Sequence, residues 1–574
     1  MKLNRITLLI TTLLLATAAI AQEPSAETLQ KHVSYLASDQ LDGRRTGTKG
    51  ANEAAKYIAK EFERLGLRPA PATDSWKINV MSARYLQTFP YIGQVDLGKN
   101  NVLSVRNGET LNLRVGEDWM PLGISPNKKL ELTEVVSAGY GITANDLNHN
   151  DYKGTYSKNQ VAVIQKGTPD GDNPHGKFTT AGQLRFKVAA AQSAGVGALL
   201  IISSEDDLKT DALAKLSYDN AGLAGIPVAV ISKQAAEKLA NAKEVTLSTD
   251  VVRIDVPAHN VVGVIEGSDP VLKNESIVIG AHYDHLGRGG EGSLAPHPGE
   301  IHHGADDNAS GTAGVLELAR FFSAQRSKLK RTLVFIAFSG EEEGLLGSNY
   351  YINHPLVPLD KTVAMINMDM IGRMKDNKLV IGGVGTAKEW RPLLTTPNDG
   401  FELSMNDDGY GPSDHSSFYI KQIPVLFFWT GTHTDYHKPS DTFDKINYTD
   451  EARILKMVAR IVTDIDTADQ RLTYTTAKVD PPRGGGFRVY LGTIPNYADS
   501  NDGLLIDGVR DDSPAAKAGL KAGDKIVKIA NRDVKNVYDY TYALGEMKAG
   551  QEYVVEVLRG AERLTLKITP QARN

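Results

Sequence analysis

Apolar residues recur with a helical period near the amino terminus of the chain. Leu29, Val33 and Leu36 share this spacing, and so do the apolar residues between positions 55 and 65. The stretch LDGRRTGTKG lies between the two runs, and its glycines and charges are typical of a loop. Residues 22–70 are therefore expected to form two helices joined by a loop.

Between residues 256 and 470 the pattern changes to short apolar runs that alternate with amphipathic segments. Helices are expected over 310–322 and 451–466, where apolar residues line one face. The strands expected in this region cover 276–285, 332–342, 362–372 and 423–431. Apolar strands alternating with helices predict an α/β fold, a mostly parallel-centred sheet with helices on both faces.

Two further changes of pattern indicate additional domains. From about residue 115, runs such as VAVIQKG and GALLIIS stand between Gly and Asn/Asp clusters, which predicts a separate mixed α/β domain ending near 255. VDPPRGGG is typical of a linker, and the residues after it suffice for one more small domain. The expected main domain has two parts, 22–114 and 256–470, with an insert over 115–255 between them. Residues 471–486 are expected to form a linker and 487–574 the last domain, while 1–21 form a separate segment at the amino terminus.

Composition and charge narrow the class of protein. The chain has 574 residues, 41% hydrophobic and 23% charged, which is typical of a globular protein with a core. Its formal net charge of -5 gives no sign of a nucleic-acid partner. Cysteine is absent, which excludes disulfides, thiol nucleophiles and thiolate metal sites. Any metal must be held by His, Asp and Glu.

The first residues have the pattern of an export signal. Lys2 and Arg5 precede an apolar stretch over 6–19, and the small-residue sequence Ala19-Ile20-Ala21 follows it. We expect a signal peptide removed after Ala21, with an uncleaved membrane anchor as the alternative. The mature protein is then exported, periplasmic or secreted, and has no membrane span.

Potential metal ligands gather at the ends of the predicted strands. Nine of the 13 histidines fall between His282 and His437. His282 and Asp284 end the first strand, Glu341 and Glu342 the second, and Asp369 the third. Ligands of open α/β sheets bind outside the carboxyl ends of the strands, so these side chains are expected to converge in one crevice.

Two further motifs complete the candidate site. GADDNASG offers Asp306 and Asp307 just before a helix, and a carboxylate can bridge two cations with its two oxygens. His437 follows the fourth strand and adds a second imidazole. Nitrogen and oxygen donors of this kind suit zinc, and more than three ligands favour a pair of ions about 3.5–4 Å apart. One of the adjacent glutamates is then a ligand and the other a general base.

The motifs AHYDH, GADDNASG, SGEEEGLLGS, NMDMIG and YHKPSDT, in this order, resemble those of the di-zinc aminopeptidase family. This family also contains glutamate carboxypeptidases, glutaminyl cyclases and the transferrin receptor ectodomain. The resemblance implies two Zn²⁺ ions per chain and a cis peptide after the bridging carboxylate, Asp307. It places His282 and Asp369 on one zinc and Glu342 and His437 on the other. It also makes Glu341 the general base and acid and lets Asp284 orient His282.

The function that this resemblance implies is an exported exopeptidase acting on peptides with a free N-terminus. The zinc pair lowers the pKa of a bridging water, Glu341 takes its proton, and hydroxide attacks the scissile carbonyl. A carboxypeptidase acting on acidic peptides and a non-catalytic binding protein similar to the transferrin receptor are the alternatives. Glutaminyl cyclization is less favoured, because that branch of the family uses a single zinc.

The two smaller domains carry resemblances of their own. Residues 115–255 look like a protease-associated domain, and the C-terminal segment resembles a PDZ domain in which YLGT (490–493) fits the carboxylate-binding loop. A C-terminal peptide is therefore a possible ligand. Ser413, Asp414 and His415 match a motif lining the same active-site region. The other nearby histidines are expected to be rim or structural residues: His285, His302, His303 and His433.

Overall fold

A computed structural model describes most of the chain. The described residues are 23–70, 84–144, 147–171, 177–178, 181–203, 218, 222–240, 242–290, 292–295, 299–396, 400–477, 489–496, 502–510 and 512–572. The predicted signal peptide over residues 1–21 and most of the predicted linker lie outside them. No helix within these ranges is long and apolar enough to cross a membrane.

A mixed nine-stranded sheet forms the centre of the main domain, with strand order β1-β14-β16-β15-β17-β20-β18-β19 and β2 also paired to β14. Strands β16, β15, β17 and β20 are mutually parallel, and antiparallel strands flank them. The bounds are β1 Arg68–Pro69, β2 Leu86–Leu97, β14 Val251–Ile265, β15 Ser276–His282, β16 Thr332–Phe338, β17 Thr362–Met368, β18 Lys378–Gly382, β19 Glu402–Met405 and β20 Val425–Trp429. The predicted α/β fold with a parallel-centred sheet is confirmed.

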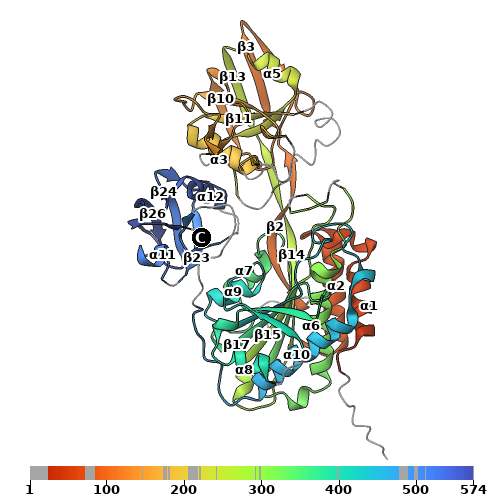
Figure 1. The fold of residues 1–574 in the computed structure, drawn as a ribbon. Helices are drawn as coiled ribbons and strands as arrows, with labels where there is room; N and C mark the ends of the chain where they lie inside the picture. The colour runs from red at the N-terminus through yellow and green to blue at the C-terminus, as the bar shows by residue number, and fades with distance from the viewer. Residues whose placement is uncertain are drawn as a thin grey trace, which may run out of the picture.

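Helices cover both faces of this sheet (Figure 1). On one face, Ile277 and Ile279 of β15 join a core shared with α1 (Ala26–Leu36), α2 (Lys49–Arg64), α6 (Gly311–Ser323) and α10 (Tyr448–Thr467). On the other face, Val278 packs in a core with α7 (Leu346–Asn353) and α9 (His415–Ile420). Alternate residues of one strand thus point to opposite cores, so the central strands are apolar throughout.

The central strands end earlier than the sequence pattern predicts. β15 ends at His282, β16 at Phe338 and β17 at Met368, three or four residues before the predicted ends. The acidic residues that follow each strand therefore lie on turns. Their side chains are released from the strict in-and-out alternation of a strand and can point into a common space.

The long antiparallel pair of β2 and β14 joins the main domain to a second unit, at the top of Figure 1. This unit contains two larger sheets with strand orders β5-β12-β11-β10-β7 and β4-β3-β13-β6, a small pair of β8 (Thr143–Ala144) and β9 (His149–Asn150), and the helices α3 (Leu184–Ala194) and α5 (Lys233–Ala240). The strands are β3 Val102–Asn107, β4 Glu109–Leu113, β5 Trp119–Pro121, β6 Lys128–Leu132, β7 Glu134–Ser137, β10 Gln160–Gln165, β11 Ala198–Ile202, β12 Val228–Ile231 and β13 Glu244–Thr249. β3 and β4 precede the expected boundary at residue 115, yet β3 pairs with β13 of this unit.

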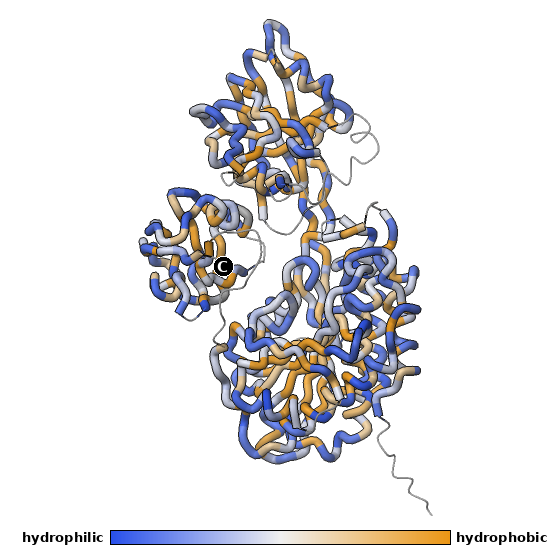
Figure 2. The backbone as a smooth tube through the Cα atoms, in the orientation of Figure 1, coloured by the Kyte–Doolittle hydropathy of each residue, from blue (hydrophilic) through white to orange (hydrophobic). Residues whose placement is uncertain are grey.

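A third unit covers the described residues after 488. Its main sheet has the order β22-β23-β24-β26-β27, with β25 also paired to β24, and α11 (Pro514–Lys517) and α12 (Val537–Glu546) pack against it. The strands are β21 Val489–Tyr490, β22 Thr493–Pro495, β23 Leu504–Val509, β24 Asp524–Ile529, β25 Arg532–Asp533, β26 Tyr553–Arg559, β27 Glu562–Ile568 and β28 Gln571–Ala572. Hydrophobic residues concentrate inside each of the three units (Figure 2).

Candidate metal centre

Asp307 lies at the middle of a cluster of carboxylates and imidazoles. It belongs to the turn Ala305–Ser310 that leads into α6, and its peptide bond to Asn308 is cis, as the resemblance implies. The two carboxylate oxygens point to different partners. Asp307 Oδ1 is 3.4 Å from His282 Nε2, and Oδ2 is 3.2 Å from His437 Nε2. Asp307 therefore stands between two imidazoles, as a bridging ligand would.

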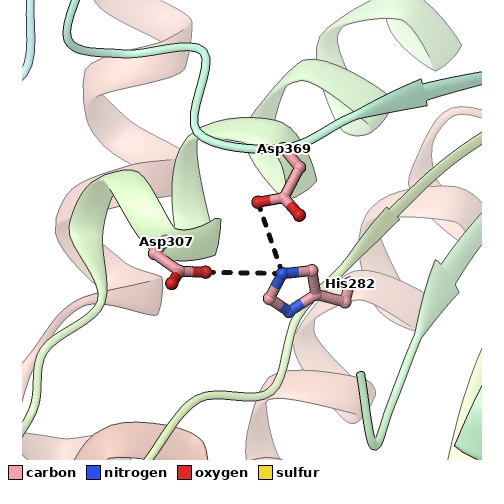
Figure 3. A group of neighbouring side chains, drawn as sticks. All are labelled: His282, Asp307 and Asp369. Atoms are coloured by element: carbon pink, nitrogen blue, oxygen red, sulfur yellow. Dashed lines mark ion pairs between the residues drawn. The ribbon is translucent and has the colours of Figure 1, made fainter. Parts of the chain in front are cut away.

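His282 and Asp369 form what we call the strand side of the cluster. His282 is the last residue of β15 and Asp369 directly follows β17. Asp369 Oδ1 lies 3.4 Å from His282 Nε2, and Figure 3 shows both carboxylates pointing at the imidazole. His282 Nε2 is buried and has no hydrogen-bond partner among the described residues. An orphaned nitrogen facing carboxylates is the arrangement that a bound cation would complete.

Glu342 and His437 form the loop side. Glu342 Oε2 is 3.3 Å from His437 Nε2, which is the nitrogen that also faces Asp307. His437 Nδ1 lies 2.7 Å from the backbone carbonyl of Gly292, to which it can donate. A histidine that ligates a metal commonly donates its other ring N–H to a carbonyl or carboxylate.

The spacing of these atoms fits tetrahedral zinc. Two ligand atoms about 2.0–2.1 Å from a tetrahedral ion stand roughly 3.3 Å apart. The nitrogen–oxygen distances on the strand side are both 3.4 Å, and those on the loop side are 3.2 and 3.3 Å. The donor set of imidazoles and carboxylates also suits zinc. The residues present therefore fit one ion on each side of Asp307.

The electrostatics of the cluster favour positive charge. Burial opposes protonation of His282, but the carboxylates of Glu341 and Asp369 raise its pKa well above the usual value. Burial also raises the pKa of Glu341, whose Oε2 lies 3.8 Å from His282 Nε2, and the charge of Asp369 adds to the effect. A carboxyl group with a raised pKa is a stronger proton acceptor than an ordinary glutamate.

Asp284 touches His282 in a different way from the one expected. The backbone carbonyl of Asp284 lies 3.2 Å from His282 Nδ1, while its carboxylate oxygen Oδ1 is 3.7 Å away. That carboxylate instead accepts hydrogen bonds from Thr46 Oγ1 at 2.9 Å and from the backbone N–H of Glu341 at 3.3 Å. Asp284 thus links the turn that carries Glu341 to the end of β15.

Asp306 points away from the cluster although it is the neighbour of Asp307. Its carboxylate accepts the backbone N–H of Gly372 at 2.7 Å and lies 3.1 Å from His433 Nε2. Asp441 accepts the backbone N–H groups of both aspartates, at 3.0 and 3.1 Å. These hydrogen bonds fix the turn in the orientation that leaves Asp307 facing the imidazoles.

Two residues of the LDGRRTG loop support the site, and sequence reasoning assigned them no role. Arg44 is buried, and its guanidinium donates to the carbonyls of Leu36, Tyr283, His303 and Gly304 at 2.6–2.9 Å. It therefore ties the N-terminal loop to the segments after β15 and before Asp307. Thr46 holds Asp284, as described above. The glycines and charges of this loop were the only signal in the sequence.

His285 was expected to be a rim or structural residue, and sequence reasoning assigned it no contact with a ligand. Its side chain is buried, and Nδ1 lies 2.6 Å from Glu342 Oε1. His285 offers a ligand atom close to those of Asp307 and Glu342, so it either orients Glu342 or stands beside the loop-side ion. Its position directly after Asp284 in AHYDH was the available signal.

The remaining histidines near the site have partners away from the cluster. His302 Nε2 lies 2.7 Å from Ser293 Oγ, and His303 pairs with Asp39. His415 is buried and stacks on Phe427 with ring centroids 4.5 Å apart.

Comparisons with known proteins agree with this architecture. Residues 260–462 match the description "Peptidase family M28", and residues 490–569 match "PDZ domain". Aminopeptidase YwaD of Bacillus subtilis is 30% identical over 274 residues, 46% of this chain and 55% of that protein. A probable leucine aminopeptidase of Arthroderma otae is 28% identical over 202 residues, 34% of this chain and 54% of that protein. The chain spans about half the length of these relatives.

A solved structure of BSAP, a zinc aminopeptidase from Bacillus subtilis, superposes with a TM-score of 0.48 at 22% identity, covering 77% of this chain and 95% of that one. The assignment of the middle unit to a protease-associated domain stays a prediction. The five ordered motifs, the cluster that they form and the family match lead to one conclusion: the chain belongs to peptidase family M28 and also carries a PDZ domain.

Proposed function

We propose that this protein is a zinc-dependent aminopeptidase that removes N-terminal residues from peptides. The observation that carries the proposal is the placement of Asp307 between two imidazoles, at 3.4 Å from His282 and 3.2 Å from His437. The names of the relatives, aminopeptidase and zinc aminopeptidase, support the same activity.

The residues that would hold two zinc ions are those of the cluster. Asp307 would bridge them, with His282 and Asp369 on the strand side and Glu342 and His437 on the loop side. When bound, zinc supplies a Lewis acid for the scissile carbonyl and lowers the pKa of water.

Glu341 would move the proton. Its carboxylate lies beside the strand side, and neither of the two pairs described above needs it as a ligand. Burial raises its pKa, which suits a group that takes a proton from water and returns it to the leaving amine. The backbone N–H of Glu341 donates to Asp284, so the turn that carries the carboxylate is fixed.

The free α-amino group of the substrate would be bound by carboxylates of the same cluster. Glu341 Oε2 and Asp369 Oδ1 lie 3.8 and 3.4 Å from His282 Nε2, and carboxylates in this position can accept hydrogen bonds from an amine.

A pair of peptides tests the proposal. Purified protein, loaded with zinc, is incubated with a peptide carrying a free N-terminus and with its N-acetylated form, and the released residues are identified by mass spectrometry. We expect release of the first residue from the free peptide only. Release of the C-terminal residue instead would favour a carboxypeptidase, and no hydrolysis with zinc bound would favour a non-catalytic binding protein.

We propose in addition that the protein is exported. The support is the pattern of the first residues, in which Lys2 and Arg5 precede a short apolar stretch that ends at a small-residue site. N-terminal sequencing of the protein isolated from its native host tests this, and we expect the mature chain to begin at Gln22.

A further inference from the structure

A pocket of about 570 Å³ lies between the PDZ domain and the peptidase domain. The C-terminal unit lies beside α7 and α9, at the left of Figure 1. On the PDZ side the pocket is lined by β22 and by one face of α12, where Val537, Tyr540, Thr541 and Leu544 recur at helical spacing. This wall is the groove between a strand and a helix in which PDZ domains bind extended peptides.

The strand that forms this wall, β22, is an edge strand of its sheet in the described part of the chain, paired with β23 along one side. An extended peptide can add to such an edge through main-chain hydrogen bonds. The apolar face of α12 then meets its side chains.

The opposite wall shares its backbone with the candidate metal centre. Leu345 lines the pocket, and its N–H donates to the carbonyl of Glu341 at 3.0 Å. Three Cα steps of about 3.8 Å separate Leu345 from Glu342, so their Cα atoms lie within about 11 Å. Ser416, on the same wall, is two residues after Asp414. The pocket therefore begins one turn of chain away from the proposed general base.

Polar groups at the PDZ end of the pocket suit a carboxylate. Gly492 has φ 79° and lies in the turn between β21 and β22, where successive backbone N–H groups can converge on an anion. Arg510 also lines the pocket. Its Nη1 donates to Asp408 at 2.6 Å, and its guanidinium lies 5.2 Å from the centre of the Tyr410 ring.

Contacts on two sides hold the PDZ domain in this position. The ion pair of Arg510 with Asp408 joins it to the peptidase domain. Tyr542 of α12 is buried in the hydrophobic core of the middle unit, and Asn536 donates to the carbonyl of Leu223 at 3.3 Å. The groove face of α12 is thus turned toward the peptidase domain while another face packs on the middle unit.

We infer that one peptide occupies both places, with its N-terminal residue at the metal centre and its C-terminal end in this pocket. The favoured substrates are then short peptides that end in an apolar residue with a free carboxylate. The inference rests on the proposed aminopeptidase function. An extended chain advances about 3.3 Å per residue and covers the roughly 11 Å between Glu342 and the near wall of the pocket at Leu345 in three or four residues. A peptide that also fills the groove must be longer than this, and an octapeptide is used for the test.

The test compares three substrates with the zinc-loaded full chain. They are an octapeptide ending in valine with a free carboxylate, the same octapeptide as its C-terminal amide, and leucine p-nitroanilide, which has no C-terminal extension. The N-terminal amino acid released from each peptide is identified, which separates this effect from carboxypeptidase action. We expect kcat/KM for the free acid to exceed that for the amide by about ten- to a hundredfold, the usual value of hydrogen bonds to a charged group.

Two matched variants locate the effect. Leu544→Asp places a charge on the pocket face of α12, and we expect it to abolish the difference between acid and amide. Val554→Asp makes the same change on an exposed residue of β26 and should preserve the difference. Equal kcat/KM for acid and amide in the wild-type protein, with the anilide hydrolysed, would overturn the inference and leave the aminopeptidase proposal intact. Failure to hydrolyse the anilide and both peptides would overturn both.

Discussion

The strand side and the loop side of the metal centre share Asp307 but are held in different ways. On the strand side, His282 and Asp369 stand at the ends of adjacent parallel strands, and the register of β15 and β17 fixes their distance. On the loop side, His437 lies in a loop with φ 54°, held by its contact with Gly292 and stacked on Tyr436. The side chain of His282 is 1% exposed and that of His437 14%.

In the proposed two-ion arrangement, one ion site would be formed by the sheet and the other by loops that must first pack together. A ligand on a buried strand loses little further freedom when a cation binds, whereas a ligand on a partly exposed loop loses more. We therefore expect the two sides to differ in affinity, with the strand side binding zinc more tightly.

Stepwise removal of zinc should produce the largest effect. With increasing chelator, we expect the loop-side ion to leave first and hydrolysis to fall below detection once the chain is metal-free, with recovery on adding zinc. Metal content by mass spectrometry and activity are measured on the same samples. Simultaneous loss of both ions would break the comparison between the two sides.

Glu341→Gln should lower kcat by about two to four orders of magnitude, because it removes the group that transfers the proton. The amide is close in size to the carboxylate, and Glu341 belongs to neither pair of proposed ligands, so both sides should still bind zinc. Turnover is followed with an aminoacyl anilide and metal content by elemental analysis. Near wild-type turnover would exclude Glu341 as the base.

Asp414→Asn should change the stability of the metal-free protein in a pH-dependent way. Burial raises the pKa of Asp414 from 3.8 to about 7, so the folded state holds the proton that the unfolded state releases. Stability from this group is present below pH 3.8 and is lost as pH rises through 7, on the order of 4 kcal/mol in all.

The variant should therefore raise the unfolding free energy of chelator-treated protein at pH 8 and change it little at pH 4, as measured by urea denaturation. Equal effects at both pH values would show that burial of the Asp414 charge does not account for the change.

Two substitutions beside the proposed ligands should give the smallest of these effects, one on each side of the metal centre. Asp284→Asn acts on the strand side, where the Asp284 carboxylate lies 3.7 Å from His282 Nδ1 and accepts the backbone N–H of Glu341. His285→Leu acts on the loop side, where His285 Nδ1 lies 2.6 Å from Glu342 Oε1. Each should lower zinc affinity on its own side by about ten- to a hundredfold, the usual effect of changing a residue next to a metal ligand. Calorimetric titration with zinc separates the two sites. Equal losses on both sides from either variant would contradict the division.

His282, Asp369 and His437 of the candidate centre could be predicted from the residues alone, because each one ends or follows an apolar strand. Asp307 and Glu342 needed the family motifs to choose between adjacent acids. Arg44, Thr46 and His285 could not be found. Their roles depend on contacts between segments far apart in the chain, such as Arg44 with Gly304, which no local pattern records.

The sequence by itself determined the α/β core, since alternate residues of one strand must fill two cores, and it determined the donor set, since without cysteine only oxygen and imidazole ligands remain. The pattern of residues left open which of two adjacent acids faces the cluster, and the tertiary structure supplies the physical reason. Asp306 and Asp307 have the same chemistry, and hydrogen bonds from Gly372 and to Asp441 give them opposite directions. The tertiary structure also decided that the PDZ groove opens toward the peptidase domain, because the relative placement of two folded units follows from their surfaces and not from the periodicity of either.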